Sequence, residues 1–180
     1  MTTNINEAFN KPTAWRPNDT HYLEKIEGIG DVVSIVEIGV DYGFSLFTFA
    51  RDFPNARVIG VDNFSYGDGK EQQSHLQNFL PLFPKASIIA AESGEARRVY
   101  EHTDFYLDID ILHIDADHSY EGVKRDFDLW SNAVRPGGVV LFHDINSFPE
   151  GPGRFFKELE GKKDSITQGA GLGIWWKDVD

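Results

Sequence analysis

Short apolar runs rich in β-branched residues alternate with longer amphipathic segments along most of this 180-residue chain. Such runs predict buried strands, and apolar positions spaced three or four residues apart predict helices. The runs predict strands at residues 32–38, 57–61, 86–91, 109–114, 139–142, 165–168 and 172–176. The amphipathic segments predict helices at residues 21–29, 45–53, 70–83, 94–102 and 153–159, and from 119 to the Pro-Gly-Gly at 136–138. This alternation is typical of a doubly wound, Rossmann-like α/β sheet of about seven strands.

The end of the chain departs from the parallel pattern. Gly169-Ala170-Gly171 joins the last two strands tightly, which predicts a hairpin and hence an antiparallel last strand on a mostly parallel sheet. We find no internal repeat, low-complexity tract or linker. We therefore expect an amino-terminal arm and short helix over residues 1–31 and one domain over residues 32–180. Residues 1–20 suggest an arm or a poorly ordered lead-in.

Charge and composition exclude several classes of partner. The net charge of −12, without any Lys/Arg cluster, argues against nucleic acid. No segment has the roughly 20 apolar residues needed to cross a membrane, and the first residues do not resemble a secretory signal. Because the chain has no cysteine, it forms no disulfide or thiolate metal site. We expect a soluble, cytoplasmic protein, and the aromatic content allows a homodimer without locating an interface.

Acidic and histidine residues follow two apolar runs that a single helix separates. The run 109–114 leads to Asp115 and His118, and the run 139–142 leads to His143 and Asp144. If these strands are parallel neighbours, their carboxyl ends meet at the edge where open α/β sheets bind ligands. Carboxylate and imidazole groups there could hold Mg²⁺ or Mn²⁺, and His118 could take a proton near neutral pH. Helix capping by Asp115 and a strand-end role for His143 are the structural alternatives. His113, within the strand, is expected to pack in the core.

A glycine turn and two further strand ends predict a nucleoside pocket. The first strand breaks at Glu37-x-Gly39-x-x-x-Gly43, where backbone can approach a ligand closely, although an ordinary βα turn would look the same. Asp41 replaces the glycine of a dinucleotide-binding loop and disfavours a pyrophosphate. Asp62 ends the second strand, about 20 residues beyond the turn, where a carboxylate accepts hydrogen bonds from ribose hydroxyls. Glu92-Ser93, ending the third strand, would lie near the nucleobase.

These motifs together resemble class I S-adenosylmethionine-dependent methyltransferases, in particular small bacterial O-methyltransferases related to macrolide-sugar and catechol-type enzymes. The resemblance covers roughly residues 32–177. It rests on VEIGVDYGFS, VIGVDNF, ILHIDADHSYEGVKRDFDLW, RPGGVVLFHDI and GLGIWW. It implies a seven-stranded sheet whose last strand is antiparallel.

The resemblance also assigns roles to residues of this chain. It implies a cofactor site made of Glu37, Gly39, Tyr42, Gly43, Ser45, Asp62, Asn63, Glu92, Ser93 and Asp115. In the metal-dependent relatives the aspartate at the position of Asp115 binds the cation, and the residue three further on, here His118, is the general base. An acidic or Asp-Asn pair completes their metal site; this chain has His143-Asp144 instead. We thus expect Asp115, His118 and His143 to be catalytic and Asp115, His143 and Asp144 to hold any metal.

The predicted function is methyl transfer from S-adenosylmethionine to a hydroxyl of a small molecule or sugar, with or without a divalent cation such as Mg²⁺. Three alternatives stay open from the residues. One is a metal-independent N- or O-methyltransferase of the same fold. Another is an oxidoreductase that uses a nicotinamide dinucleotide, which Asp41 disfavours. The third is a non-catalytic module that binds a nucleoside cofactor.

Overall fold

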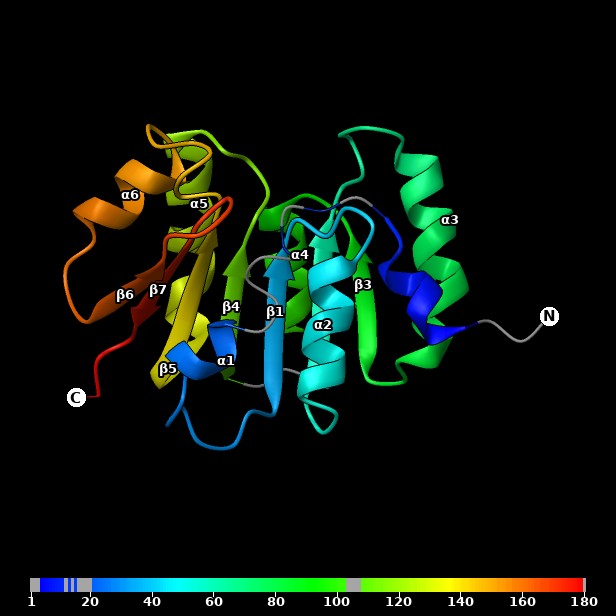
Figure 1. Cartoon of the computed structure of the whole chain (residues 1–180), viewed down its shortest axis with the longest axis horizontal. Helices are drawn as coiled ribbons and strands as arrows, with labels where there is room; N and C mark the ends of the chain where they lie inside the picture. The colour runs from blue at the N-terminus through cyan, green and yellow to red at the C-terminus, as the bar shows by residue number, and fades with distance from the viewer. Residues whose placement is uncertain (1–3, 12, 14, 16–20, 103–107, 180) are drawn as a thin grey trace.

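The computed structural model describes residues 4–11, 13, 15, 21–102 and 108–179. Within them, seven strands form one sheet in the order β3-β2-β1-β4-β5-β7-β6 (Figure 1). The strands are β1 (Ser34–Ile38), β2 (Arg57–Asp62), β3 (Ala86–Ala90), β4 (Ile109–Ile114), β5 (Val134–His143), β6 (Lys163–Ile166) and β7 (Leu172–Trp176). β1 to β5 run parallel, β7 is antiparallel to β5, and β6 is antiparallel to β7. The predicted doubly wound sheet with an antiparallel last strand is confirmed.

Helices cover both faces of the sheet (Figure 1). Two core clusters bury the alternating side chains of the strands. Successive strand residues point to opposite faces: Ile35 and Ile111 belong to one core cluster, Val36 and Leu112 to the other. The first cluster packs under α1 (His21–Lys25), α2 (Phe44–Asp52) and α3 (Gly69–Phe79). The second packs under α4 (Ser93–Glu101), α5 (Tyr120–Trp130) and α6 (Pro152–Glu158). Within the described chain, no helix is both long and apolar enough to span a membrane.

The described part of the amino-terminal arm packs onto the domain. Residues Ile5–Phe9 form a short 3₁₀ helix, and the ring of Phe9 makes edge contacts with Phe44 and Phe83. Trp15 is only 2% exposed and lies in the first core cluster. Residues 1–3, 12, 14 and 16–20 of the predicted arm lie outside the described residues. The arm thus contributes apolar side chains to the face that α2 covers.

The segment after α5 differs from the sequence prediction. Val134, which was expected on the apolar face of the helix, instead begins β5, and the Pro-Gly-Gly lies inside the strand. The helix ends at Trp130, and one 3₁₀ turn, Ser131–Ala133, leads into the strand. The pairing of β4 with β5 jumps from Ile109–Val134 to Ile111–Val139, which marks a bulge at Pro136-Gly137-Gly138. A bulge tolerates a proline that cannot donate to the sheet.

Other differences are small shifts of element boundaries. The predicted helix 70–83 is α3 followed by a 3₁₀ turn, Leu80–Leu82, with Pro81 near its start. Proline removes a backbone donor and disfavours continuation of the preceding helix. β6 begins two residues before the predicted strand 165–168, and α1 is shorter than the predicted helix 21–29. None of these shifts moves a residue of the predicted site.

Candidate functional site

The carboxyl ends of β1 to β5 border a cleft of about 820 Å³. Most residues of the predicted site line this cleft: Gly39, Tyr42, Ser45, Asp62, Asn63, Glu92, Ser93, Asp115, His118, His143 and Asp144. Glu37 and Gly43 are not among its lining residues. The parallel pairing of β1, β2, β3, β4 and β5 brings these strand ends to the same edge of the sheet, as expected for this fold.

The end of β1 and the end of β4 touch at Gly39. Its φ is +90°, and a Cβ at this position would lie 2.2 Å from the carbonyl oxygen of Asp115. Only glycine suits both the positive φ and the close approach. Gly43, with φ of +80°, precedes α2, whose first residues Phe44 and Ser45 line the cleft. The glycine turn therefore sets the distance between the first and fourth strand ends and directs the start of α2 toward the cleft.

Glu37 lies behind the cleft wall in a buried polar contact. Its Oε1 accepts a hydrogen bond from the Ser45 hydroxyl and lies 2.8 Å from Nδ1 of His113. The side chains of Glu37 and His113 are both fully buried. Burial raises the pKa of Glu37, while the hydrogen bond from His113 opposes that shift. His113 is thus the core histidine that the sequence predicted, and its partner is the acidic residue of the glycine turn.

Asp62 ties the glycine turn to the end of β2. Its Oδ2 accepts hydrogen bonds from the backbone amides of Val40 (2.8 Å) and Asp41 (3.0 Å). Its Oδ1 accepts one from the amide of Phe64 at 2.7 Å. An ionised carboxylate offers about four lone-pair positions, so about one remains for a ligand hydroxyl. Asp62 therefore both shapes the turn and keeps an acceptor for a ligand.

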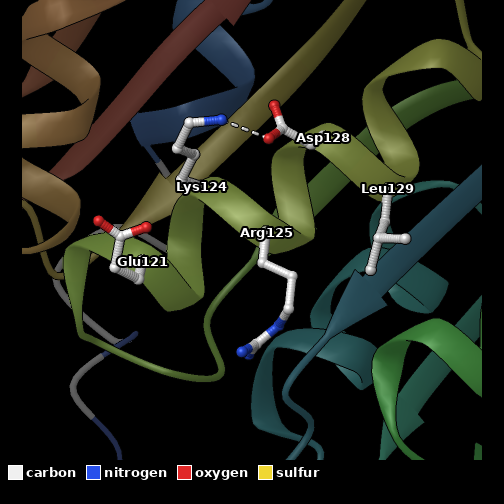
Figure 2. Close-up of a pocket in the computed structure, with 5 residues that line it drawn as sticks. All are labelled: Glu121, Lys124, Arg125, Asp128 and Leu129. Carbon is white, nitrogen blue, oxygen red and sulfur yellow. Dashed lines mark hydrogen bonds and ion pairs between the residues drawn. The ribbon is translucent and has the colours of Figure 1, made fainter.

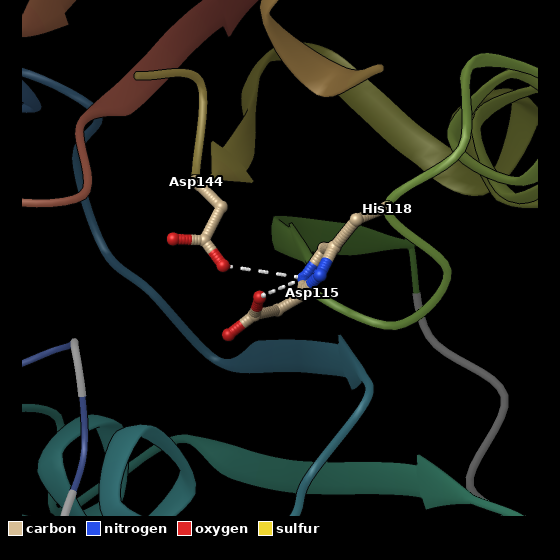
Figure 3. A group of neighbouring side chains, drawn as sticks. All are labelled: Asp115, His118 and Asp144. Atoms are coloured by element: carbon tan, nitrogen blue, oxygen red, sulfur yellow. Dashed lines mark hydrogen bonds and ion pairs between the residues drawn. The ribbon is translucent and has the colours of Figure 1, made fainter. Parts of the chain in front are cut away.

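Asp115, His118 and Asp144 form the reactive cluster of the cleft (Figure 3). Nε2 of His118 lies 3.3 Å from Oδ1 of Asp115 and 3.3 Å from Oδ2 of Asp144. His143, almost fully buried, places Nδ1 at 3.2 Å from the same Asp115 oxygen. The carboxylate and imidazole atoms of Asp115, His118 and Asp144 that could bind a metal all lie within 4.8 Å of one another. The two strand ends thus converge as the sequence predicted.

Attraction between carboxylates and imidazoles shifts the pKa values of this cluster. Burial by itself would raise the pKa of Asp115, but the neighbouring His143 and His118 outweigh it and hold that pKa well below its usual value. Burial lowers the pKa of His143, but Asp115 and Asp144 reverse the effect and raise it to about 10. The hydrogen bond with Asp115 raises the pKa of His118. Attraction between Asp115 and His143 therefore outweighs the cost of burying either charge.

Two aromatic residues that the sequence did not single out bracket the reactive cluster. The ring of Trp15 lies 5.4 Å from that of His143 and 4.7 Å from that of His113, centroid to centroid. The ring of Phe148 stacks on His118 at 4.3 Å with an interplanar angle of 25°. Both line the cleft. A tryptophan in an arm and a phenylalanine in a loop carry no local pattern that marks them as site residues.

The cleft wall is strongly acidic. Its carboxylates are Asp41, Asp62, Glu92, Asp115, Asp117, Asp126 and Asp144, against the guanidinium of Arg125 and the imidazoles of His118 and His143. Such a wall attracts a cationic ligand and repels a phosphate-bearing one. This agrees with the expectation that the ligand carries no pyrophosphate.

The fold is shared with solved methyltransferases. The O-methyltransferase TomG of Streptomyces achromogenes, involved in tomaymycin synthesis and solved with S-adenosylmethionine, is 17% identical with a TM-score of 0.70, and the match covers 97% of this chain and 89% of that one. The methyltransferase MycE of the mycinamycin biosynthetic pathway, solved with Mg and S-adenosylhomocysteine, is 17% identical with a TM-score of 0.62, covering 88% and 48%. This likeness shows that the fold of the chain is that of the class I S-adenosylmethionine-dependent methyltransferases.

Sequence comparison places the chain within this class. Residues 36–145, more than half of the chain, match the family described as methyltransferase domain, and the protein belongs to that family. An uncharacterized protein of Sinorhizobium fredii is 28% identical over 164 residues, which cover 81% of this chain. The chain spans only 17% of the length of that relative.

Proposed function

We propose that this protein transfers the methyl group of S-adenosylmethionine to a hydroxyl oxygen of a small molecule or sugar. The observation that carries the proposal is that two features line the same cleft. One is the glycine turn, whose amides bind Asp62, and the other is the cluster of Asp115, His118 and Asp144. A cofactor-binding turn beside a proton-accepting cluster is what alkyl transfer to oxygen requires. Membership of the methyltransferase-domain family supports the same reaction.

The cleft suits a sulfonium cofactor. S-adenosylmethionine supplies an activated methyl group on a positively charged sulfur and carries no phosphate. The seven carboxylates of the wall favour that charge. Asp62 keeps about one acceptor position for a ribose hydroxyl after its three backbone hydrogen bonds. The same wall would repel the pyrophosphate of a nicotinamide dinucleotide, which makes the oxidoreductase alternative less favourable.

His118 is the proposed general base. His118 Nε2 would take the proton of the acceptor hydroxyl, and S-adenosylmethionine, when bound, would supply the methyl group and leave as S-adenosylhomocysteine. Asp115 and Asp144, each with an oxygen 3.3 Å from that nitrogen, stabilise the resulting imidazolium. The stack on Phe148 holds the ring in place. Alignment of the two reactants in the cleft contributes much of the acceleration.

A divalent cation is the optional part of this proposal. Asp115, Asp144 and His143 were expected to hold it. The carboxylate oxygens of Asp115 and Asp144 lie close enough to share one ion with a ring nitrogen of His118, and that nitrogen would then not act as the base. Two carboxylates and an imidazole suit Mg²⁺ or Mn²⁺. A cation bound there would orient and acidify the acceptor hydroxyl. A metal-independent N- or O-methyltransferase remains the alternative, because His143 already places a cationic group beside Asp115.

The proposal is tested first by calorimetric titration with S-adenosylhomocysteine, with and without Mg²⁺. We expect binding by the wild type and a loss of at least tenfold, about 1.4 kcal/mol, in Asp62→Ala. Asp68→Ala is the control, because Asp68 is an acidic residue of the β2–α3 connection that follows Asp62 in the chain but only caps α3. Absence of binding in the wild type would overturn the proposal. Binding without transfer to any hydroxyl compound would favour the non-catalytic alternative.

Cellular location and assembly stay predictions. The absence of cysteine supports a cytoplasmic location. The aromatic content allows a homodimer, and sedimentation of the purified protein would test whether one forms.

A further inference from the structure

Asp126 is a buried acidic residue of the cleft that the mechanism does not use. It lies in the middle of α5, a helix whose other acidic residues Glu121 and Asp128 are exposed. Its side chain is only 1% exposed, yet the residue lines the cleft together with Ser93 and Glu92. A carboxylate is rarely buried unless something compensates for its lost hydration. The position therefore requires a specific partner.

The protein provides only part of that compensation. The Ser93 hydroxyl accepts a hydrogen bond from the indole Nε1 of Trp130 at 3.0 Å. The same hydroxyl lies near the Asp126 carboxyl group and partly offsets the effect of burial on the pKa of Asp126. The carboxylate oxygen Oδ1 of Asp126 is buried and has no hydrogen-bond partner among the described residues. Nε of Arg125 lies 4.0 Å from Oδ1, which is too far for a hydrogen bond. Burial raises the pKa of Asp126, as expected for a carboxyl group that is incompletely solvated.

The position of Asp126 along the cleft indicates which part of a ligand it would meet. The reactive cluster lies at the ends of β4 and β5, and the ribose acceptor Asp62 lies at the end of β2. The sheet order β3-β2-β1-β4-β5 therefore places the methyl-transfer end and the base end of a nucleoside cofactor on opposite sides of β1. Ser93 starts α4 directly after β3, and Asp126 lines the cleft near Ser93, so Asp126 lies at the base end.

From these contacts we infer that Asp126 recognises the exocyclic 6-amino group of the cofactor's adenine through its Oδ1. This inference rests on the proposed function. The amino group is a hydrogen-bond donor, and an ionised carboxylate only accepts. Hypoxanthine carries an oxygen at that position, which would face the carboxylate without a hydrogen atom between them. Asp126 would thus select adenine over other purines that share the ribose and the methionine.

The wild-type protein provides the first test. S-inosylhomocysteine differs from S-adenosylhomocysteine by the replacement of the 6-amino group with oxygen, and both can be titrated calorimetrically. We expect the wild type to bind S-adenosylhomocysteine at least about tenfold more tightly, because a buried acceptor would otherwise lose its only donor. Equal affinity for the two compounds would overturn the inference while leaving the proposed function intact. Binding of neither compound would instead overturn the proposed function.

Asp126→Asn then tests the residue itself. The asparagine amide can donate to the hypoxanthine oxygen, so we expect the preference for S-adenosylhomocysteine to shrink by about tenfold or to reverse. Asp128→Asn is the matched control, because Asp128 lies on the same helix but forms an exposed ion pair with Lys124 (Figure 2). The side chain of Arg125 points away from this pair (Figure 2). The control should keep the wild-type preference. A purely structural role of Asp126 in holding Ser93 would lower stability or weaken both compounds equally, and this outcome would also overturn the inference.

Discussion

Nδ1 of His113 on β4 lies 2.8 Å from Oε1 of Glu37 on the neighbouring strand β1, and both side chains are fully buried. This contact joins the two central strands directly below the cleft. Removal of one partner leaves a buried polar group without its hydrogen bond, which typically costs several kcal/mol. We expect Glu37→Leu to lower the free energy of unfolding by about 3 kcal/mol or more, measured by urea titration.

The double variant Glu37→Leu/His113→Leu is the informative comparison. It removes both polar groups, so we expect it to be more stable than Glu37→Leu alone. If the double variant loses the sum of the two single losses, the two side chains act independently and the pair does not stabilise the protein.

His118 should matter for transfer and little for cofactor binding. With methyl transfer from labelled S-adenosylmethionine to an acceptor found by screening hydroxyl compounds, we expect His118→Ala to lower kcat about 100-fold or more. Calorimetric affinity for S-adenosylhomocysteine should change by less than about threefold. Phe148→Ala, which removes the stacked ring, should lower kcat by a smaller factor. Equal losses of turnover and cofactor affinity in His118→Ala would contradict the general-base role.

The metal option has its own test in the reactive cluster. If the donors of Asp115, His118 and Asp144 hold a cation, Mn²⁺ should bind to the wild type and be lost in Asp144→Asn. Electron paramagnetic resonance of free Mn²⁺ measures both. Asp117→Asn is the control, since Asp117 lines the same cleft but is not part of the cluster. Equal Mn²⁺ binding by all three proteins would place the ion elsewhere, and no binding would favour the metal-independent alternative.

Substitution by alanine should destabilise the protein more at Gly39 than at Gly28. At Gly39 an added Cβ would meet the Asp115 carbonyl at 2.2 Å, whereas at Gly28 it would meet nothing within 4 Å. Both have a positive φ, so Gly28→Ala should cost about 1 kcal/mol from backbone strain alone. Gly39→Ala should cost about 3 kcal/mol or more, because the fourth strand end must also move. Chemical unfolding measures both, and similar losses would contradict the steric argument.

His75 should make the stability depend on pH. Burial lowers its pKa below the ordinary 6.5, and its Nε2 lies 3.2 Å from the carbonyl oxygen of Ala8 in the arm. The unfolded chain therefore binds this proton more tightly than the folded protein, so protonation favours unfolding. Above about pH 6.5 the residue is neutral in both states and contributes no slope; the loss develops as the pH falls from about 6.5 to the lowered pKa.

The variant His75→Gln isolates this effect. Glutamine can still donate to Ala8 but does not titrate. The difference in unfolding free energy between wild type and variant, from urea titrations at pH 8, 6 and 5, should be constant above about pH 7 and move against the wild type below about pH 6.5. A difference that stays constant down to pH 5 would show that His75 has the same pKa in the folded and unfolded states.

Local patterns in the chain were sufficient for the architecture and for most of the cleft. The five parallel strands contain short apolar runs. The runs followed by Asp62, Asp115 and Asp144 place their carboxylates at the same edge, because parallel strands end together. The positive φ at Gly39 and Gly43 also follows from a glycine-containing turn between a strand and a helix. These features depend on residues that are close in the sequence and on the rule that parallel strands end at the same edge of the sheet.

Contacts between distant segments decided the rest. Trp15 reaches His143 from the arm, Phe148 reaches His118 from a loop, and Asp126 reaches Ser93 from the inner side of α5. Glu37 turned out to lie behind the cleft wall, held by His113, and Val134 joined a strand because a bulge accommodates the Pro-Gly-Gly. None of these follows from spacing along the chain, because burial and hydrogen bonding depend on which surfaces the folded layers bring together.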